Sequence, residues 1–297
     1  MLSLCMSRSV SIVGAGRLGR TLGRSLRRLG WRIGPVVTRS AASARAAVRS
    51  IGAGTPYSTL TRDVIDADVI LLVTPDDALA DAARKLAGVA GRSCRGKVVL
   101  HASGALDSSI LWPLARCGAA VGSIHPMQTF TKRSQPSLKG VIFAVEGEPR
   151  ALRMASGIAR ILGGVPVIVT SSNKPSYHAA GTLVAGHALA LTEAAAQVLI
   201  EIGFTRRHAV QTLLPLMRQV LDNFEKYGPR AAWTGPTARG DYATVKKHRD
   251  ALRHHPHEFG DSYATLVRLS ARVLTKNPAK TLKQLDRVLK NSRRNQK

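Results

Sequence analysis

The chain has 297 residues, of which 44% are hydrophobic, so it can bury a sizeable core and is long enough for two domains. Its formal net charge of +26, from 44 Lys and Arg against 18 Asp and Glu, raises nucleic acid as a partner. The basic residues are spread along the whole chain, however, and only 4% of residues are aromatic, so no platform for stacking bases is visible. We therefore expect no specific nucleic-acid partner. The positive field would still attract a phosphorylated cofactor or an acidic substrate.

The sequence shows no sign of membrane insertion or export. No apolar run reaches the ~18 residues of a membrane span, and the first six residues are too short for a signal-peptide core. The three cysteines, Cys5, Cys94 and Cys117, form no CxxC pair and are too few for a disulfide framework. We expect a cytoplasmic protein without membrane contact, in which all three cysteines are bystanders.

Three closely spaced histidines, His254, His255 and His257, stand at the expected end of a helix. No carboxylate or cysteine accompanies them at the spacing of known metal ligands. We predict surface histidines and no metal site.

The pattern of apolar and polar residues changes near residue 173. Before it, short apolar runs alternate with amphipathic stretches, a pattern typical of a parallel sheet covered by helices. The expected strands are 10–13, 33–38, 68–74, 97–101, 120–124, 141–145 and 165–169. After it, helical patterns run over 175–202, 207–227, 242–253 and 258–275. In the first of these, Leu183, His187 and Leu191 share one stripe, so we expect His187 to be packed in a core.

A glycine-rich loop follows the first expected strand directly. It reads Gly14-Ala15-Gly16-Arg17-Leu18-Gly19 and leads into a helical pattern. This strand, turn and helix make up the dinucleotide-binding fingerprint, in which the glycines allow a tight turn, approach of the backbone to a pyrophosphate and close packing of helix on strand. The helix N-terminus would supply N–H donors and a partial positive charge.

The end of the second strand distinguishes NAD from NADP. NAD-binding proteins usually carry a carboxylate there to hold the ribose 2′-hydroxyl. This chain has Thr38, Arg39 and Ser40 instead. Arg39 can pair with a 2′-phosphate through its forked guanidinium, the neighbouring hydroxyls can assist, and so can Arg17 in the loop. The predicted cofactor is therefore NADP(H).

Further candidates follow the ends of later strands, at the edge where open α/β sheets bind ligands. Thr74 and Pro75 are expected to line the cofactor. Residues 101–104 (HASG) supply His101, Ser103 and Gly104 as further cofactor contacts. Residues 125–130 (HPMQTF) supply His125 next to the expected nicotinamide position, with Gln128 and Thr129 as candidate substrate contacts.

With YHAA at 177–180 and TGPTARGD at 234–241, these stretches complete a pattern that covers about residues 8–275. The chain resembles bacterial Rossmann-like proteins whose helical C-terminal half is a domain of unknown function. Those proteins are related to the 6-phosphogluconate and β-hydroxyacid dehydrogenase superfamily and to the deazaflavin-dependent NADP reductases. The resemblance implies an oxidoreductase of unassigned substrate with a helical domain that often forms a dimer.

The predicted fold is α/β: a Rossmann-type, doubly wound, mostly parallel sheet over residues 8–172, an all-α domain over 173–290 and a basic tail over 291–297. We expect the helical domain to contribute to substrate binding and to form a homodimer.

Hydride transfer needs a proton donor close to the substrate. His125, Tyr177 and His178 are the candidates, because Tyr177 and His178 lie in the region where the related superfamily places its catalytic side chain. Many relatives carry a lysine within that helix, whereas this chain has Lys174 just before it. A bond of His101 or His125 to the backbone beneath the cofactor is an open alternative.

The TGPTARGD segment supplies the remaining substrate candidates. Arg239 is expected to hold a substrate carboxylate in a cleft between the domains. Asp241 would either orient Arg239 or cap the next helix.

The sequence thus predicts an NADP(H)-dependent oxidoreductase that acts on a small, carboxylated carbonyl or imine compound. Two alternatives stay open: a non-catalytic NADP(H)-binding or redox-sensing protein, and a basic protein associated with nucleic acid.

Overall fold

The computed structural model describes residues 8–91, 94–131 and 136–289; Cys5 and the predicted tail at 291–297 lie outside these ranges. The chain forms two compact units, Met1–Gly186 and His187–Lys297. The predicted boundary between residues 172 and 173 falls where the last strand has ended and the long helices begin. By compactness the first unit extends further, to Gly186, and so keeps the first turns of that helical segment.

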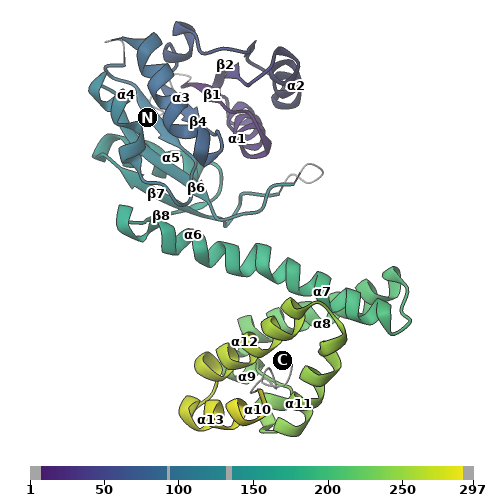
Figure 1. The fold of residues 1–297 in the computed structure, drawn as a ribbon. Helices are drawn as coiled ribbons and strands as arrows, with labels where there is room; N and C mark the ends of the chain where they lie inside the picture. The colour runs from purple at the N-terminus through teal and green to yellow at the C-terminus, as the bar shows by residue number, and fades with distance from the viewer. Residues whose placement is uncertain (1–7, 92–93, 132–135, 290–297) are drawn as a thin grey trace, which may run out of the picture. The chain divides into compact units, whose positions relative to one another are not determined.

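An eight-stranded sheet forms the centre of the first unit, in the order β3-β2-β1-β4-β5-β6-β7-β8 (Figure 1). The strands are β1 (Ser9–Val13), β2 (Arg32–Val37), β3 (Thr55–Tyr57), β4 (Val69–Leu72), β5 (Val98–His101), β6 (Ala120–Pro126), β7 (Ile142–Gly147) and β8 (Val165–Ile168). All neighbours are parallel except β6 and β7. The predicted mostly parallel sheet and its seven predicted strands are confirmed. The eighth strand, β3, was not predicted.

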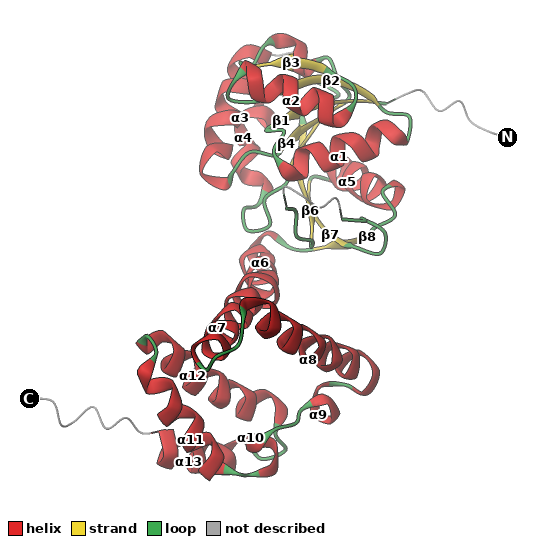
Figure 2. Ribbon diagram, turned by 90° about the vertical axis from the view of Figure 1, so that its right-hand side faces the viewer, coloured by secondary structure: helices red, strands yellow, loops and turns green. Residues whose placement is uncertain are grey.

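Helices cover both faces of this sheet (Figure 2). One face packs against α1 (Arg17–Arg28), α2 (Ala41–Ile51) and α5 (Pro149–Ile161), and the other against α3 (Asp76–Ala90) and α4 (Trp112–Arg116). Alternation along β1 supplies both cores, since Ile12 points to the first face and Val13 to the second. These two buried layers hold the carboxyl ends of the strands in place.

The rest of the described chain is helical. It comprises α6 (Lys174–Thr182), a π-helical segment (Leu183–His187), α7 (Ala188–Glu201), α8 (Arg206–Tyr227), α9 (Pro229–Ala232), α10 (Pro236–Arg239), α11 (Tyr242–Ala251), α12 (His257–Leu274) and α13 (Pro278–Leu289). The predicted all-α C-terminal region is confirmed. In the second unit, a small core of Val245, Ala271, Leu285 and Leu289 joins α11, α12 and α13.

Much apolar surface of these helices is uncovered. Leu183, His187 and Leu191 are all exposed, so the prediction that His187 is packed in a core was wrong. The periodicity correctly indicates an apolar face, but it does not show what covers that face. The helical stretch Ser171–Glu201 is also long and apolar enough to cross a membrane by length and composition, and only 6% of its most apolar window is buried.

Candidate functional site

The glycine loop has the geometry of an anion-binding turn. Gly14 has a φ of +90°, and a Cβ built there would lie 2.6 Å from the backbone nitrogen of Thr74. A Cβ on Gly19 would lie 2.8 Å from the Gly14 oxygen, which explains why helix and strand pack so closely. Gly16, directly before α1, would meet nothing within 4 Å. The helix N-terminus therefore opens onto free space, as a pyrophosphate would require.

A cavity of about 700 Å³ lies beside this loop, within the size range of small-molecule sites. Four predicted cofactor residues line it: Gly14, Thr38, Arg39 and Thr74. Ser58, Thr59 and Lys85, which sequence reasoning missed, also line it. The hydroxyl of Thr74 is buried and has no hydrogen-bond partner among the described residues. An open turn, a cavity and an unpartnered buried hydroxyl together fit a dinucleotide.

The other predicted cofactor residues near this loop do not line the cavity. Ala15 is buried, and Arg17 donates a hydrogen bond to the Phe130 carbonyl over 3.4 Å. Ser40 is the N-cap of α2, where its hydroxyl accepts a hydrogen bond from Ser43 N. Leu18 lies in the first turn of α1, and Pro75 directly precedes α3. Their contacts with a cofactor stay predictions.

A cluster of three rings lies at the carboxyl ends of β5 and β6. His125 is the penultimate residue of β6, while Tyr177 and His178 come from the first two turns of α6. The ring centroid of His125 is 5.6 Å from that of Tyr177 and 5.5 Å from that of His178, both edge to face. The structure thus brings together all three predicted proton donors.

Gly104 lies directly against two imidazoles of this cluster, those of His125 and His178. It is buried, and a Cβ built on it would lie 2.8 Å from His125 Nε2 and would overlap His178 Nδ1. Only a glycine leaves room there for both imidazoles.

The Tyr177 hydroxyl contacts two atoms of His125. The Tyr177 hydroxyl donates to the His125 carbonyl oxygen over 3.3 Å and lies 3.2 Å from Nδ1 of the same residue. The hydroxyl has a single proton and can donate fully to only one of these two atoms, while Nε2 of His125 faces Gly104. Burial, aided by His178 and Lys174, lowers the pKa of His125 to about 4. Burial raises the pKa of Tyr177 to about 12.

Beneath the rings lies a fully buried lysine that sequence reasoning did not assign to the site. Lys174 donates from Nζ to Ser123 Oγ over 2.8 Å and to the Ser103 carbonyl over 3.1 Å. Burial lowers the pKa of this ammonium, and Glu146 is foremost among the nearby carboxylates that oppose the shift. One signal was available: a cation at a helix N-terminus opposes the macrodipole, so Lys174 needs a reason other than helix propensity.

Glu146 completes this buried network. Its carboxylate accepts hydrogen bonds from Ser123 Oγ at 3.2 Å and Ser171 Oγ at 3.1 Å, and from both the N–H and the hydroxyl of Ser108. Ser123 therefore links the ammonium of Lys174 to this carboxylate. The network joins β7 to β6 and to the start of α6, the two elements that carry the three rings.

His101 is the last residue of β5, and Ser103 belongs to the loop that follows it. His101 is fully buried, and its Nδ1 accepts a hydrogen bond from Ser103 N over 3.1 Å; burial above all lowers its pKa to about 3. With no exposed surface, its side chain can serve a cofactor only by shaping residues 103 and 104. Ser103 donates to Asp76 Oδ2 over 2.8 Å, which ties this loop to the start of α3.

The four predicted substrate contacts are divided between the two units. Gln128 and Thr129 are exposed just beyond His125, in the first unit. Arg239 and Asp241 belong to the second unit, where Arg239 ends α10 and is exposed. Asp241 caps α11 by accepting from Thr244 N over 3.0 Å, so the structure accounts for it without a ligand. Substrate binding by these four residues stays a prediction.

The three clustered histidines are not all on the surface. His254 and His257 are exposed, but the His255 side chain is only 8% exposed and its ring stacks on Phe259. The prediction was wrong for His255 because the turn folds it back onto α12. Among the described residues, no group of three or more His, Cys, Asp or Glu side chains could hold a metal ion.

Several solved structures share the fold. A proposed NADP oxidoreductase from Bacteroides fragilis has a TM-score of 0.72 and 23% identity, covering 89% of this chain and 97% of that one. A protein from Thermotoga maritima has a TM-score of 0.68 and 24% identity, covering 96% and 100%. A reductive aminase from Aspergillus terreus, solved with NADPH and ethyl-5-oxohexanoate, has a TM-score of 0.64 and 15% identity, covering 90% and 94%.

No curated protein matches the chain. Residues 5–126 match the family described as a Rossmann-like domain, and residues 141–270 match a domain of unknown function (DUF2520). The chain therefore consists of a Rossmann-like domain followed by a domain of the family DUF2520.

Proposed function

We propose that the chain is an NADP(H)-dependent oxidoreductase that transfers a hydride to or from the carbonyl or imine carbon of a small, carboxylated substrate. One observation carries the proposal: the ring cluster and the glycine loop lie at the same edge of one sheet. β1, β4, β5 and β6 run parallel, so Gly14, Thr74, Gly104 and His125 all lie at their carboxyl ends. Open α/β sheets bind their ligands at this edge.

The choice of NADP(H) rests on Arg39. It lines the cavity with Thr38, Ser58 and Thr59, which place one guanidinium and three hydroxyls around the end of β2. A carboxylate would repel a 2′-phosphate, and none of these four groups is a carboxylate. Lys85 adds a second cation to the lining, although Asp81 pairs with it at 2.7 Å.

The bound nicotinamide would supply the hydride, and the chain must supply the proton. His178 is our choice of donor, because it is exposed and its Nδ1 faces the same small residue as His125 Nε2. The Tyr177 hydroxyl donates a hydrogen bond to the His125 carbonyl, and the His125 ring is neutral above about pH 4. These two residues therefore position the site, while His178 moves the proton.

The charge of the chain supports an anionic substrate, and similarity supports a carbonyl or imine group. The chain has a formal charge of +26, which would draw an anion towards it. The fold is shared with a reductive aminase solved with NADPH and a carbonyl compound, and with a Streptomyces aurantiacus imine reductase. Carbonyl and imine carbons accept a hydride in the same way.

The first test is a calorimetric titration of the chain with NADPH and NADH. We expect NADPH to bind at least tenfold more tightly, and Arg39→Glu to abolish the preference. Arg45→Glu, an exposed α2 residue outside the cavity lining, is the matched control for charge and should keep the preference. If neither nucleotide bound, the oxidoreductase assignment would fail. Tight binding without turnover of any keto acid or imine would favour a sensor.

We also propose that the chain acts as a homodimer through its helical unit. The support is exposed apolar surface: Leu189, Leu216 and Phe224 are more than half exposed, and α8 has Ala209 as its one buried residue. A second copy would remove this surface from water. Light scattering should give twice the chain mass, and Phe224→Glu should give the monomer mass. Binding to lipid vesicles instead would assign the surface to a membrane.

A further inference from the structure

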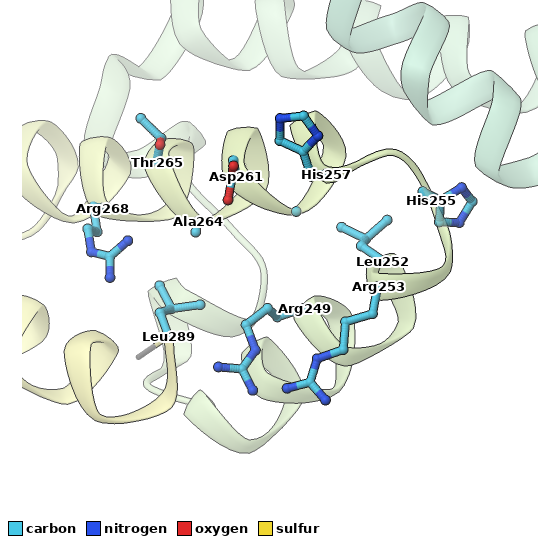
Figure 3. A pocket seen from close by; sticks show the side chains of 11 residues that line it. Arg249, Leu252, Arg253, His255, His257, Asp261, Ala264, Thr265, Arg268 and Leu289 are labelled. Atoms are coloured by element: carbon cyan, nitrogen blue, oxygen red, sulfur yellow. The ribbon is translucent and has the colours of Figure 1, made fainter. Parts of the chain in front are cut away.

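A second cavity, of about 520 Å³, lies within the helical unit between α11, α12 and the end of α13 (Figure 3). The arginines that line it already have carboxylate partners. Asp250 Oδ1 lies 2.7 Å from Arg249 Nη2 and 3.1 Å from Arg253 Nη2. Arg268 Nε lies 3.1 Å from Asp286 Oδ1. Ion pairs within the helical unit therefore account for these charges without a ligand. The first unit, by contrast, holds two free thiols that no step of the proposed reaction uses.

These thiols, Cys94 and Cys117, lie where two neighbouring strands begin, although they are far apart in the sequence. β5 and β6 are parallel, and their first residues, Val98 and Ala120, are paired. Cys94 lies in the turn before β5, where its carbonyl accepts a hydrogen bond from Lys97 N over 3.0 Å. Cys117 ends α4 shortly before β6. Because paired strands lie about 4.8 Å apart, the turns that lead into them are also neighbours.

Contacts between the two turns agree with this placement. A Cβ built on Gly118 would lie 3.4 Å from Arg95 Cα, so the backbones that directly follow the two cysteines touch. Cys94 belongs to the apolar core beneath α3 and α4, and Cys117 packs against that core. Burial, together with the charge and a hydrogen bond of Cys117, raises the pKa of the Cys94 thiol to about 11. Two thiols in such contact can be joined with little backbone movement.

The two thiols differ in their access to solvent. Cys94 is only 1% exposed, whereas Cys117 is half-buried. An oxidant in solution therefore meets Cys117 first. The Cys117 thiol is also held in place, because it donates to the Pro113 carbonyl over 3.2 Å. A reachable thiol with a second thiol behind it is the arrangement in which a first oxidation product is trapped as a disulfide.

We propose that Cys94 and Cys117 form a redox pair that a hydroperoxide converts to a disulfide. The Cys117 thiolate attacks one oxygen of hydrogen peroxide, the O–O bond breaks, and Cys117 becomes a sulfenic acid while hydroxide leaves and takes up the Cys117 proton. The Cys94 sulfur then attacks the sulfenic sulfur. The S–O bond breaks, and the hydroxyl leaves as water with the Cys94 proton. The two sulfurs together lose two electrons, which the peroxide gains.

The disulfide would fasten the turn after α3 to the end of α4. The loop that it closes contains β5, so the bond restricts the unfolded chain and should stabilise the first unit. The proposal is independent of any cofactor or substrate. It gives two of the three cysteines, which the sequence predicted to be bystanders, a common role.

The test treats the full chain with hydrogen peroxide and maps its peptides by mass spectrometry without reduction. We expect a peptide pair joined through Cys94 and Cys117, lighter than the two separate peptides by two hydrogen atoms and separated again by dithiothreitol. Cys117→Ser should abolish the link. Cys5→Ser, the matched control, removes the remaining thiol of the chain and should leave the link unchanged.

Two further measurements examine the order of the steps and the fit of the bond. In Cys94→Ala, the sulfenic acid has no partner, so dimedone should label Cys117. The urea midpoint of the wild type should rise on oxidation, and that of Cys117→Ser should not. The proposal is overturned if peroxide leaves both thiols free, if they are oxidised to sulfinic acid without a link, or if the link joins two chains or involves Cys5. A midpoint that falls on oxidation would also overturn it, because the fold would then not accommodate the bond.

Discussion

Lys174 and Glu146 are connected through a single hydroxyl: Ser123 Oγ accepts from the ammonium and lies within hydrogen-bond distance of the carboxylate. Both side chains are buried at the base of the ring cluster. A charge that loses its buried partner is left without compensation, and this costs more than the pair itself contributes.

We therefore predict that Lys174→Met lowers the free energy of unfolding by about 3–5 kcal/mol. Lys139→Met, at an exposed position, should change it by less than about 0.5 kcal/mol. Urea denaturation measures both. Glu146→Gln in the Lys174→Met background should cost less than in the wild type, because the two residues act as one unit. Additive losses would show that the two charges are independent.

Gly104→Ala tests whether close packing of residue 104 against the ring cluster matters for catalysis. The new methyl group would overlap both imidazoles, so His178 and His125 must move apart. We expect turnover to fall about 100-fold, as misplacement of a catalytic group by about 1 Å can do. Calorimetric titration with NADPH separates this loss from any loss of cofactor binding. Gly157→Ala, in α5 with open space around it, is the control and should leave turnover intact. Normal turnover in Gly104→Ala would exclude the ring cluster from catalysis.

The two α6 residues should differ in their effect on turnover. His178→Asn removes the proposed proton donor and should lower kcat about 100- to 10,000-fold. Tyr177→Phe removes only the hydroxyl that orients His125, and a loss of less than tenfold is expected. Steady-state kinetics with any accepted substrate measures both. The reverse order would make Tyr177 the donor.

Acid should weaken the fold through His101 and His125. Both imidazoles have a pKa well below the ordinary value of 6.5, so the unfolded chain binds protons first. Their stabilisation is complete above about pH 6.5 and is lost as the pH falls towards 4 for His125 and towards 3 for His101, by at most about 1.4 kcal/mol per pH unit for each group. Asp68 and Asp107, whose carboxyl pKa values are lowered, add their loss only below about pH 4.

Denaturation at pH 5 and at pH 7 measures this effect. The stability difference should shrink in His125→Asn and persist in His208→Asn, whose side chain is exposed on α8. An identical difference in all three proteins would mean that His125 does not contribute.

The sequence predicted the sheet well, because apolar runs such as Val69–Leu72 are buried on both faces and end at clear turns. It missed β3, since three residues including a proline show no alternation. Gly14 and Arg39 could be predicted to lie beside the cavity because their location depends on local backbone and on position after a strand. Ser58 and Lys85 could not, because only the folded chain brings them to the same cavity.

The ring cluster was partly predictable for the same reason. His125 and His178 stood out as titratable groups in distinctive segments. Ser123, Glu146 and Lys174 come from three separate segments, and their connection arises only when β6 and β7 pair in opposite directions. The hydrophobic periodicity of the sequence does not predict which strands pair in opposite directions.

That antiparallel pair has a practical consequence for dividing the protein into parts. The DUF2520 match begins at Val141, inside the first compact unit, and not where the long helices begin. A fragment cut at this position would carry β7 and β8 without β6, leaving the β7 edge unpaired and ready to associate with other chains. The complementary fragment would lose Glu146 and Lys174 together. Expression of either part should therefore use a cut after Gly186, where sheet and buried charges stay on one side.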